Sequence, residues 1–174
     1  VVMKPASMAP ALTLEIAKAF EEAGLPKGVL NVVVGSGKEV GDELATNPTV
    51  KALSFTGSHG VGQGIYQQLA PRMARAQMEM GGKNPTIVLA DADLDYAAKI
   101  VAMAGFMMTG QVCTATSRAI VDEKVADEFT EKLVAEAKAR NVGNGMQEGV
   151  TMGPAVCASE LEGNLGYIKI AQEE

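Results

Sequence analysis

The segment Lys51-Ala-Leu-Ser-Phe-Thr-Gly-Ser-His-Gly-Val-Gly62 indicates the fold class, because it predicts a strand, a glycine-rich turn and a helix in direct succession. The strand is expected over Lys51–Phe55 and the helix from about Gly60 to Leu69. Such a turn gathers free amide N–H groups and the positive end of the helix dipole at one point, which suits a phosphate group. Its spacing is not G-x-G-x-x-G, so a tight strand-to-helix turn without any ligand is an equally good interpretation.

The same alternation of short apolar runs and longer amphipathic runs continues on both sides of this segment. Further strands are predicted over residues 1–3, 29–34, 77–80, 86–89 and 117–121, and helices over 10–23, 39–46, 94–107, 125–140 and 166–174. Strand–helix alternation is typical of an α/β protein with a parallel sheet and right-handed crossovers. It pauses at Gly81-Gly82, which predicts two domains, 1–80 and 81–174.

Composition excludes several classes of protein. Hydrophobic residues make up 47% of the 174 residues, and the net charge is −6 without a basic patch, so we expect a folded domain and no nucleic-acid partner. The apolar runs are too short for a membrane span. The two cysteines have no framework spacing, which favours a reducing compartment such as the cytoplasm. His59 is the only histidine, so neither a histidine-rich metal site nor a Ser-His-Asp triad is expected.

Two polar segments suggest covalent catalysis. Cys113 lies in the polar, glycine-led run Gly110–Arg118, whereas Cys157 lacks such surroundings and is interpreted as a bystander. Glu79 lies in a strand expected to be buried, directly before Gly81-Gly82. A nucleophile and a general base beside glycines are the parts of a covalent mechanism. Taken singly, such a cysteine is most often an inert buried thiol, and the glutamate can be a structural carboxylate held by backbone amides.

Together these segments resemble the NAD(P)-dependent aldehyde dehydrogenase family. The resemblance lies in Glu79-Met-Gly-Gly-Lys83, in the strand ending Phe-Thr-Gly-Ser58 and in the run around Cys113, and it extends from Val1 to about Gly166. Within the family, the sequences of these motifs are most similar to those of α-ketoglutaric semialdehyde dehydrogenases. The resemblance implies that residues 1–80 are part of a Rossmann-like, parallel-sheet cofactor domain and that 81–174 begin an α/β catalytic domain.

The resemblance also implies roles for individual residues. Cys113 would be the nucleophile, with its backbone N–H in the oxyanion hole, and Glu79 would activate the water that hydrolyses the thioester. Lys4 would hydrogen-bond the adenosine ribose. The residues expected to contact the cofactor are Lys4, Ser7, Gly37, Gly57, Ser58, Gly62, Glu79 and Gly81. No metal is implied.

Ser7 bears on the choice between NAD and NADP. Family members that strongly prefer NAD often have glutamate at this position, where a carboxylate would repel a 2′-phosphate. With serine this repulsion is absent, so the sequence predicts that NADP is accepted along with NAD.

Three alternatives stay open at this point. The first alternative is a CoA-acylating semialdehyde dehydrogenase of the same fold, in which CoA replaces water. Such relatives tend to lack a glutamate at the position of Glu79, so its presence favours hydrolysis. A non-catalytic module of this fold would need neither Glu79 nor Cys113. Because the chain starts at Val1 without a methionine and stops within a predicted helix, it is also expected to be an inactive fragment of a larger protein, which would act on a small aldehyde as a homodimer or homotetramer.

Overall fold

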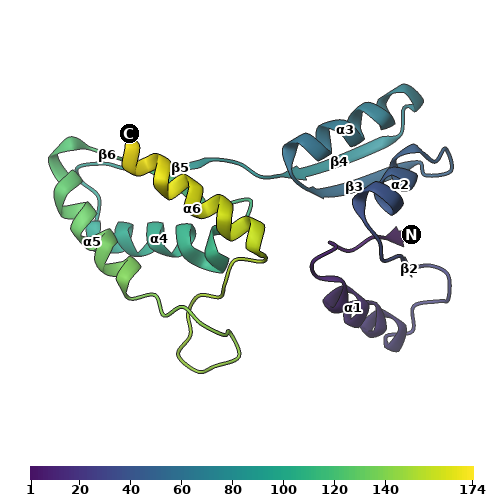
Figure 1. The fold of residues 1–174 in the computed structure, drawn as a ribbon, viewed down its shortest axis with the longest axis horizontal. Helices are drawn as coiled ribbons and strands as arrows, with labels where there is room; N and C mark the ends of the chain where they lie inside the picture. The colour runs from purple at the N-terminus through teal and green to yellow at the C-terminus, as the bar shows by residue number, and fades with distance from the viewer. The chain divides into compact units, whose positions relative to one another are not determined.

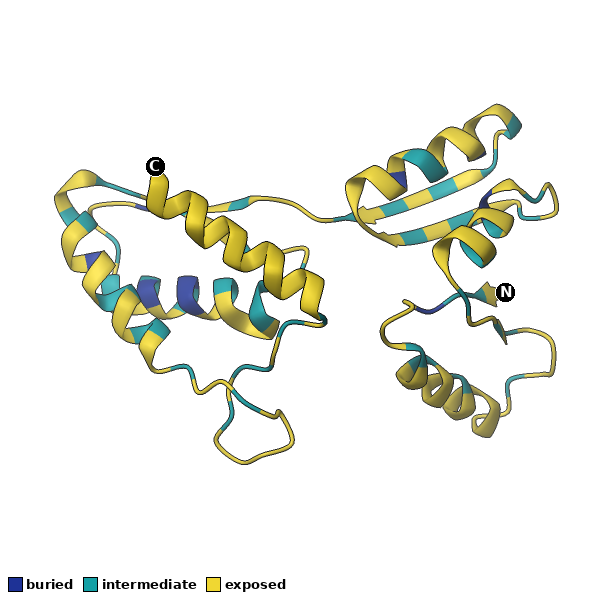
Figure 2. Ribbon diagram, in the orientation of Figure 1, coloured by how far each residue is buried: buried dark blue, intermediate teal, exposed yellow.

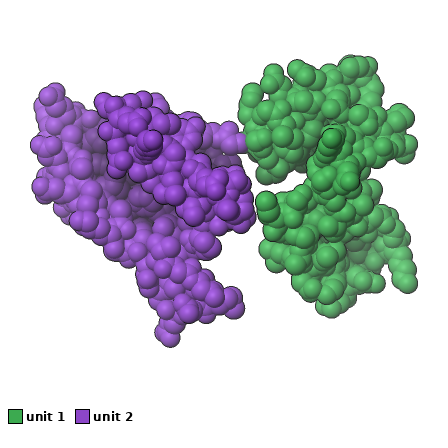
Figure 3. Space-filling model, in the orientation of Figure 1, with its two compact units in different colours: residues 1–80 green, residues 81–174 purple.

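The structure is a computed structural model that describes all 174 residues. The chain forms two compact units, Val1–Met80 and Gly81–Glu174, which are coloured separately in Figure 3. Every strand pair is parallel, and each pair is connected through a helix, as Figure 1 shows. The predicted α/β class is therefore confirmed.

The first unit begins with a short parallel pair, β1 (Val2–Met3) and β2 (Asn31–Val32), joined by α1 (Pro10–Glu22). The strand predicted over residues 29–34 is reduced to two residues. The reason is its partner: β1 is followed directly by Lys4-Pro5, and proline has no N–H to continue the ladder.

A second parallel pair completes this unit. Strands β3 (Ala52–Gly57) and β4 (Arg75–Met80) are joined by α3 (His59–Leu69) and the turn η2 (Ala70–Arg72), and Leu69 is fully buried. The helix predicted over residues 39–46 starts earlier, as a π-helical turn η1 (Gly37–Gly41) before α2 (Asp42–Thr46).

Arg72 holds the segment between α2 and β3 through hydrogen bonds to its backbone. Its guanidinium group donates to the carbonyl oxygens of Ala45 at 2.6 Å, Asn47 at 2.6 Å and Val50 at 2.7 Å. Because one rigid fork of donors holds all three carbonyls, the end of α2 is tied to the turn that follows α3.

The second unit is a parallel pair packed against helices. Its elements are β5 (Asn84–Val88), α4 (Leu94–Phe106), η3 (Met107–Gly110), β6 (Thr116–Val121), η4 (Glu123–Val125), α5 (Ala126–Lys138) and α6 (Ala158–Glu173). The buried cluster consists of Val88 on β5, Ala98 and Val101 on α4, and Phe129 on α5. Small alanines on α4 let the phenyl ring of Phe129 approach closely, and Figure 2 shows these few buried positions.

The helix predicted over residues 94–107 is confirmed together with its cap. The carboxylate of Asp93 accepts a hydrogen bond from the N–H of Tyr96 at 3.0 Å and so satisfies one of the free donors of the first turn. By contrast, α1 buries none of its residues, and its apolar stripe of Leu12, Ile16 and Phe20 is exposed. No helix has the combination of length and hydropathy that a membrane crossing requires.

Candidate active site

Glu79 lies beside the glycine turn that follows β3. In the parallel register of β3 and β4, Thr56 pairs with Glu79 and Gly57 pairs with Met80. The carboxyl ends of both strands therefore meet at one edge of this small sheet. The structure brings Glu79 to the same edge as Gly57 and Ser58, which are separated from it by the whole of α3.

The expected burial of Glu79 is wrong, because its side chain is exposed within this unit. Successive residues of a strand point to opposite faces. Met80 faces α3, since a Cβ added to Gly62 of that helix would lie 2.6 Å from the Met80 sulfur. Glu79 points to the other face, where its carboxylate accepts a hydrogen bond from the Gln77 side chain at 3.4 Å.

The N-terminus of α3 leaves its amide donors free. Ser58 precedes the helix in an extended conformation, and its hydroxyl makes no capping hydrogen bond. A Cβ added at Gly60 would meet nothing within 4 Å, so the first turn is open. Free N–H groups at the start of a helix of 11 residues fit a phosphate group.

The two glycines of this turn region have packing reasons as well. A Cβ on Gly57 would lie 2.4 Å from the tip of the Phe55 ring. Gly62 is a buried residue of α3 that lies against Met80 of β4. Their lack of side chains therefore lets α3 lie close to the sheet, whatever they contribute to cofactor binding.

The remaining candidates in the first unit follow β1 and β2. The ammonium group of half-buried Lys4 donates to the carbonyl oxygen of Pro5 at 2.8 Å, and its stem passes 4.0 Å from a Cβ placed on Gly41. Gly37 opens η1 with no atom within 4 Å of an added Cβ. Because β1 and β2 are parallel, Lys4 and Gly37 both follow carboxyl ends of strands. Ser7 is exposed in the turn before α1.

Cys113 lies exposed in the loop between η3 and β6, in the second unit. The segment before this loop is strained, since Met108 and Thr109 have φ angles of 52° and 58°, whereas the φ angle of 71° at Gly110 is one that glycine adopts freely. Left-handed conformations are unfavourable for residues with side chains, above all β-branched ones such as Thr109. A conformation of this kind persists only where the surroundings hold it in place.

Two carboxamide side chains, those of Gln111 and Asn84, hold this loop, and the sequence alone predicted a role for neither of them. The Gln111 amide donates to the Met108 carbonyl at 3.0 Å and contacts the Thr109 hydroxyl, and its oxygen accepts from the N–H of Val156 at 2.9 Å. On the other side, Asn84 donates to the carbonyls of Cys113 and Ala115. For Asn84, the sequence did contain a signal, because its carboxamide directly precedes Pro85. Proline has no N–H to donate across the strands, so a neighbouring side chain can supply the donor.

The surroundings of Cys157 are more polar than the sequence indicated, while its predicted role as a bystander stays a prediction. It is the N-cap residue of α6, and its sulfur lies 3.1 Å from the hydroxyl oxygen of Ser159. The Ser159 hydroxyl, helped by the backbone N–H groups of Glu160 and Ser159, lowers the pKa of the Cys157 thiol. Free N–H groups at a helix start favour a thiolate in this way.

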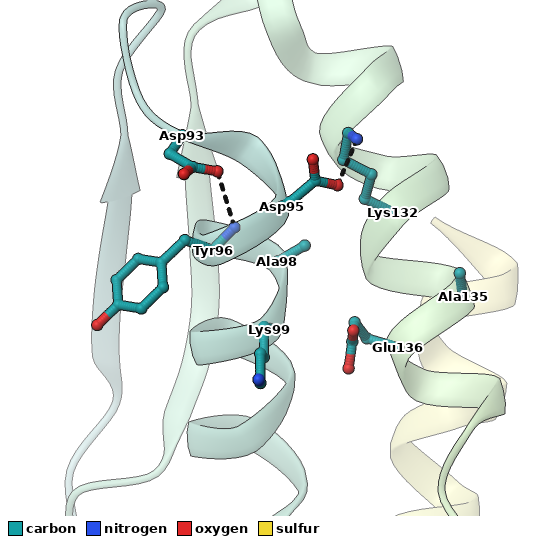
Figure 4. Close-up of a pocket in the computed structure, with 8 residues that line it drawn as sticks. All are labelled: Asp93, Asp95, Tyr96, Ala98, Lys99, Lys132, Ala135 and Glu136. Atoms are coloured by element: carbon teal, nitrogen blue, oxygen red, sulfur yellow. Dashed lines mark hydrogen bonds and ion pairs between the residues drawn. The ribbon is translucent and has the colours of Figure 1, made fainter.

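A shallow groove between α4 and α5, drawn in Figure 4, contains none of the predicted site residues. Its central contact is an ion pair of 2.5 Å between Lys132 and Asp95, with Glu128 at 3.6 Å from the same ammonium group. The hydrogen bond to Asp95 raises the pKa of Lys132. The ion pair of Lys132 with Asp95 connects α4 and α5. Nowhere in the chain do three His, Cys, Asp or Glu side chains come close enough together to bind a metal ion.

Comparison with known proteins gives a consistent result. The family model described as "Aldehyde dehydrogenase family" matches residues 1–174. The α-ketoglutarate semialdehyde dehydrogenase of Haloferax volcanii is 52% identical over 174 residues, which are 100% of this chain and 36% of that protein.

Solved structures agree. The crystal structure of γ-glutamyl-γ-aminobutyraldehyde dehydrogenase from Burkholderia cenocepacia has a TM-score of 0.96 at 45% identity, covering 100% of this chain and 36% of its own. An aldehyde dehydrogenase of Pseudomonas syringae in complex with NAD⁺ and octanal has a TM-score of 0.89 at 36% identity, covering 93% and 33%. The chain thus spans about a third of the length of the relatives it matches.

Proposed function

Because the chain belongs to the aldehyde dehydrogenase family, we propose that the whole protein oxidises a semialdehyde to a carboxylic acid with NAD or NADP. The observation that supports this most strongly is the 52% identity to an α-ketoglutarate semialdehyde dehydrogenase across all 174 residues. We propose α-ketoglutaric semialdehyde as the first substrate to test. The proposed location is the cytoplasm, and the proposed assembly is a homodimer or homotetramer.

Residues 1–80 are proposed to form the carboxyl-terminal part of the cofactor domain, and 81–174 the beginning of the catalytic domain. The free N–H groups before and within the first turn of α3, together with the Ser58 hydroxyl, fit a pyrophosphate group. Lys4 would hydrogen-bond ribose hydroxyls, and the uncharged, exposed Ser7 leaves room for a 2′-phosphate. When bound, NAD or NADP supplies the hydride acceptor.

The proposed chemistry of the chain's own residues has two stages. The Cys113 thiolate forms a C–S bond to the aldehyde carbon, and the carbonyl π pair moves to oxygen, where the Cys113 backbone N–H stabilises the negative charge. Loss of hydride from that carbon restores the C=O bond and leaves a thioester. Glu79 then takes a proton from a water molecule while the oxygen of that water attacks the thioester carbon. The C–S bond breaks, which releases the acid and regenerates the thiolate.

The test is NAD(P)H formation by the whole protein with α-ketoglutaric semialdehyde, compared with Cys113→Ala and Cys157→Ala. We expect Cys113→Ala to lower turnover by at least roughly a thousandfold, as loss of a nucleophile does elsewhere. Cys157→Ala is the matched control and should keep activity. Full turnover in Cys113→Ala would disprove the proposed chemistry. The 174-residue chain alone is expected to be inactive.

The rival in which CoA replaces water is distinguished by product analysis. With CoA present, the proposed function gives the free acid, whereas the rival gives an acyl-CoA thioester. Glu79 favours the free acid, because it offers a base for water at the edge of the sheet beside the glycine turn. A folded whole protein that binds NAD⁺ but turns over no aldehyde would support a non-catalytic module.

A further inference from the structure

The side-chain amide of Asn84 connects the start of β5 to the loop that holds Cys113. Its nitrogen donates to the carbonyl oxygen of Cys113 at 2.8 Å and to that of Ala115 at 3.1 Å. These partners lie 29 and 31 residues away in the sequence. Both hydrogens of the amide group are therefore used on one loop.

A side chain is needed here because the backbone ladder is interrupted. Asn84 pairs with Thr116 and Pro85 pairs with Arg118, so the register between β5 and β6 shifts at this point. Pro85 has no N–H to donate across the strands. Asn84 supplies the missing donors from its side chain, directly where the loop from Cys113 enters β6.

These hydrogen bonds restrict the backbone of Cys113 itself. The N–H of Ala115 donates to the carbonyl of Val112 at 3.0 Å, which places Cys113 at the second position of a four-residue turn. With its carbonyl oxygen held by Asn84, Cys113 cannot rotate freely about ψ. The directions of its N–H group and of its Cα–Cβ bond are thereby set relative to β5.

We propose that Asn84 is a positioning residue for Cys113, which aligns the thiol and the backbone N–H for attack on a carbonyl. The proposal rests on the proposed function, in which Cys113 is the nucleophile. Asn84 acts through the loop and contacts neither substrate nor cofactor. Because a small misplacement of reacting groups is costly, loss of both hydrogen bonds is expected to slow acyl transfer about tenfold.

The experiment compares two reactions of Cys113 in the whole protein without cofactor. 4-Nitrophenyl acetate acylates the thiolate: the C–S bond forms, the ester C–O bond breaks and 4-nitrophenolate leaves, after a tetrahedral oxyanion that the Cys113 N–H must meet. Iodoacetamide alkylates the same thiolate by displacing iodide, with no oxyanion. Mass spectrometry of the peptide that contains Cys113 reports both rates.

The variants are Asn84→Leu, which keeps the number and branching of the side-chain heavy atoms without a donor, and Asn84→Ser, which keeps one hydroxyl donor. Asn141→Leu is the matched control, because the Asn141 amide donates to the carbonyl of Gly149 at 3.0 Å in a different loop of the same unit. We expect Asn84→Leu to slow acylation about tenfold while alkylation changes less than about twofold. Asn84→Ser should lie between Asn84→Leu and the wild type, and Asn141→Leu should match the wild type.

Equal slowing of both reactions, unchanged acylation in Asn84→Leu, or the same loss in Asn141→Leu would each overturn the proposal. If Asn84→Leu does not fold, Asn84→Ala replaces it with the same expectations. Failure of the proposed function has a separate signature, which is aldehyde oxidation that survives Cys113→Ala. The acylation-to-alkylation ratio is measured on the thiol directly, so it does not depend on that result.

Discussion

Glu79 on β4 lies directly opposite Thr56 on β3. Thr56 is the residue that precedes the turn formed by Gly57 and Ser58. Residues separated by an entire strand–helix crossover are therefore neighbours at one edge of a parallel sheet. This places the backbone of the residue proposed to activate water beside the turn proposed to accept phosphate. The carboxyl edge of parallel strands is where ligands bind in open α/β sheets.

Replacing Glu79 with glutamine should separate the two stages of the reaction. Hydride loss does not require the carboxylate, so a first burst of NAD(P)H is expected to remain. Steady-state turnover should fall about 100- to 10,000-fold, because water then lacks its base. Rapid-mixing absorbance measures both phases. An unchanged steady state would exclude Glu79 as the base, and Gln77→Glu, on the same face of β4, tests whether any nearby carboxylate can take its place.

Ser7→Glu should change the choice of cofactor. A carboxylate near the 2′-position would repel the phosphate of NADP and hydrogen-bond the hydroxyl of NAD. We expect the ratio of kcat/KM for NAD to that for NADP to rise about tenfold. Ser7→Gln has a similar size without the charge and should leave the ratio close to that of the wild type. The same rise in both variants would show that size, and not charge, matters.

Ser159→Ala should reduce the reactivity of Cys157 near neutral pH. The Ser159 hydroxyl lowers the pKa of this thiol, so the reactive thiolate forms at lower pH than in an ordinary cysteine. Without the hydroxyl the pKa should rise, and the midpoint of the iodoacetamide rate against pH should move upwards. The Cys157 peptide is followed by mass spectrometry. A midpoint that stays in place would mean that the helix N–H groups alone set the pKa.

Phe129→Ala tests the core of the second unit. The ring is 1% exposed and packs against α4, so its removal should lower the free energy of unfolding by about 3–5 kcal/mol. Urea unfolding of the whole protein measures the change. Phe106→Ala is the control, because that ring is 38% exposed and should cost clearly less. Equal losses would show that Phe129 is not central to the core.

Local patterns in the sequence predicted most elements of the fold. Apolar periodicity located α4 and α5, and the Asp93 carboxylate marked the start of α4 as observed. The short strand β2 was overestimated because its length depends on a distant partner that proline ends. The π-helical turn before α2 has no periodic signal that distinguishes it from an ordinary helix.

The site was less predictable than the fold. Motifs indicated Cys113 and Glu79, but the exposure of Glu79 follows from which face of β4 is covered by α3, and that depends on register. The hydrogen bonds of Asn84 join positions about thirty residues apart and arise from a register shift at Pro85. The local sequence marks only the carboxamide before Pro85, and it does not indicate the distant partners of that side chain. The roles proposed for the cofactor-contacting residues stay predictions.

Each strand of this chain has a single neighbour, since all three sheets are two-stranded. Every sheet therefore presents two open edges of N–H and C=O groups, and the apolar stripe of α1 is exposed as well. Such edges are templates for pairing with other chains. If these residues were synthesised alone in a cell, their open edges and exposed apolar side chains would be expected to make them targets of chaperones and proteases.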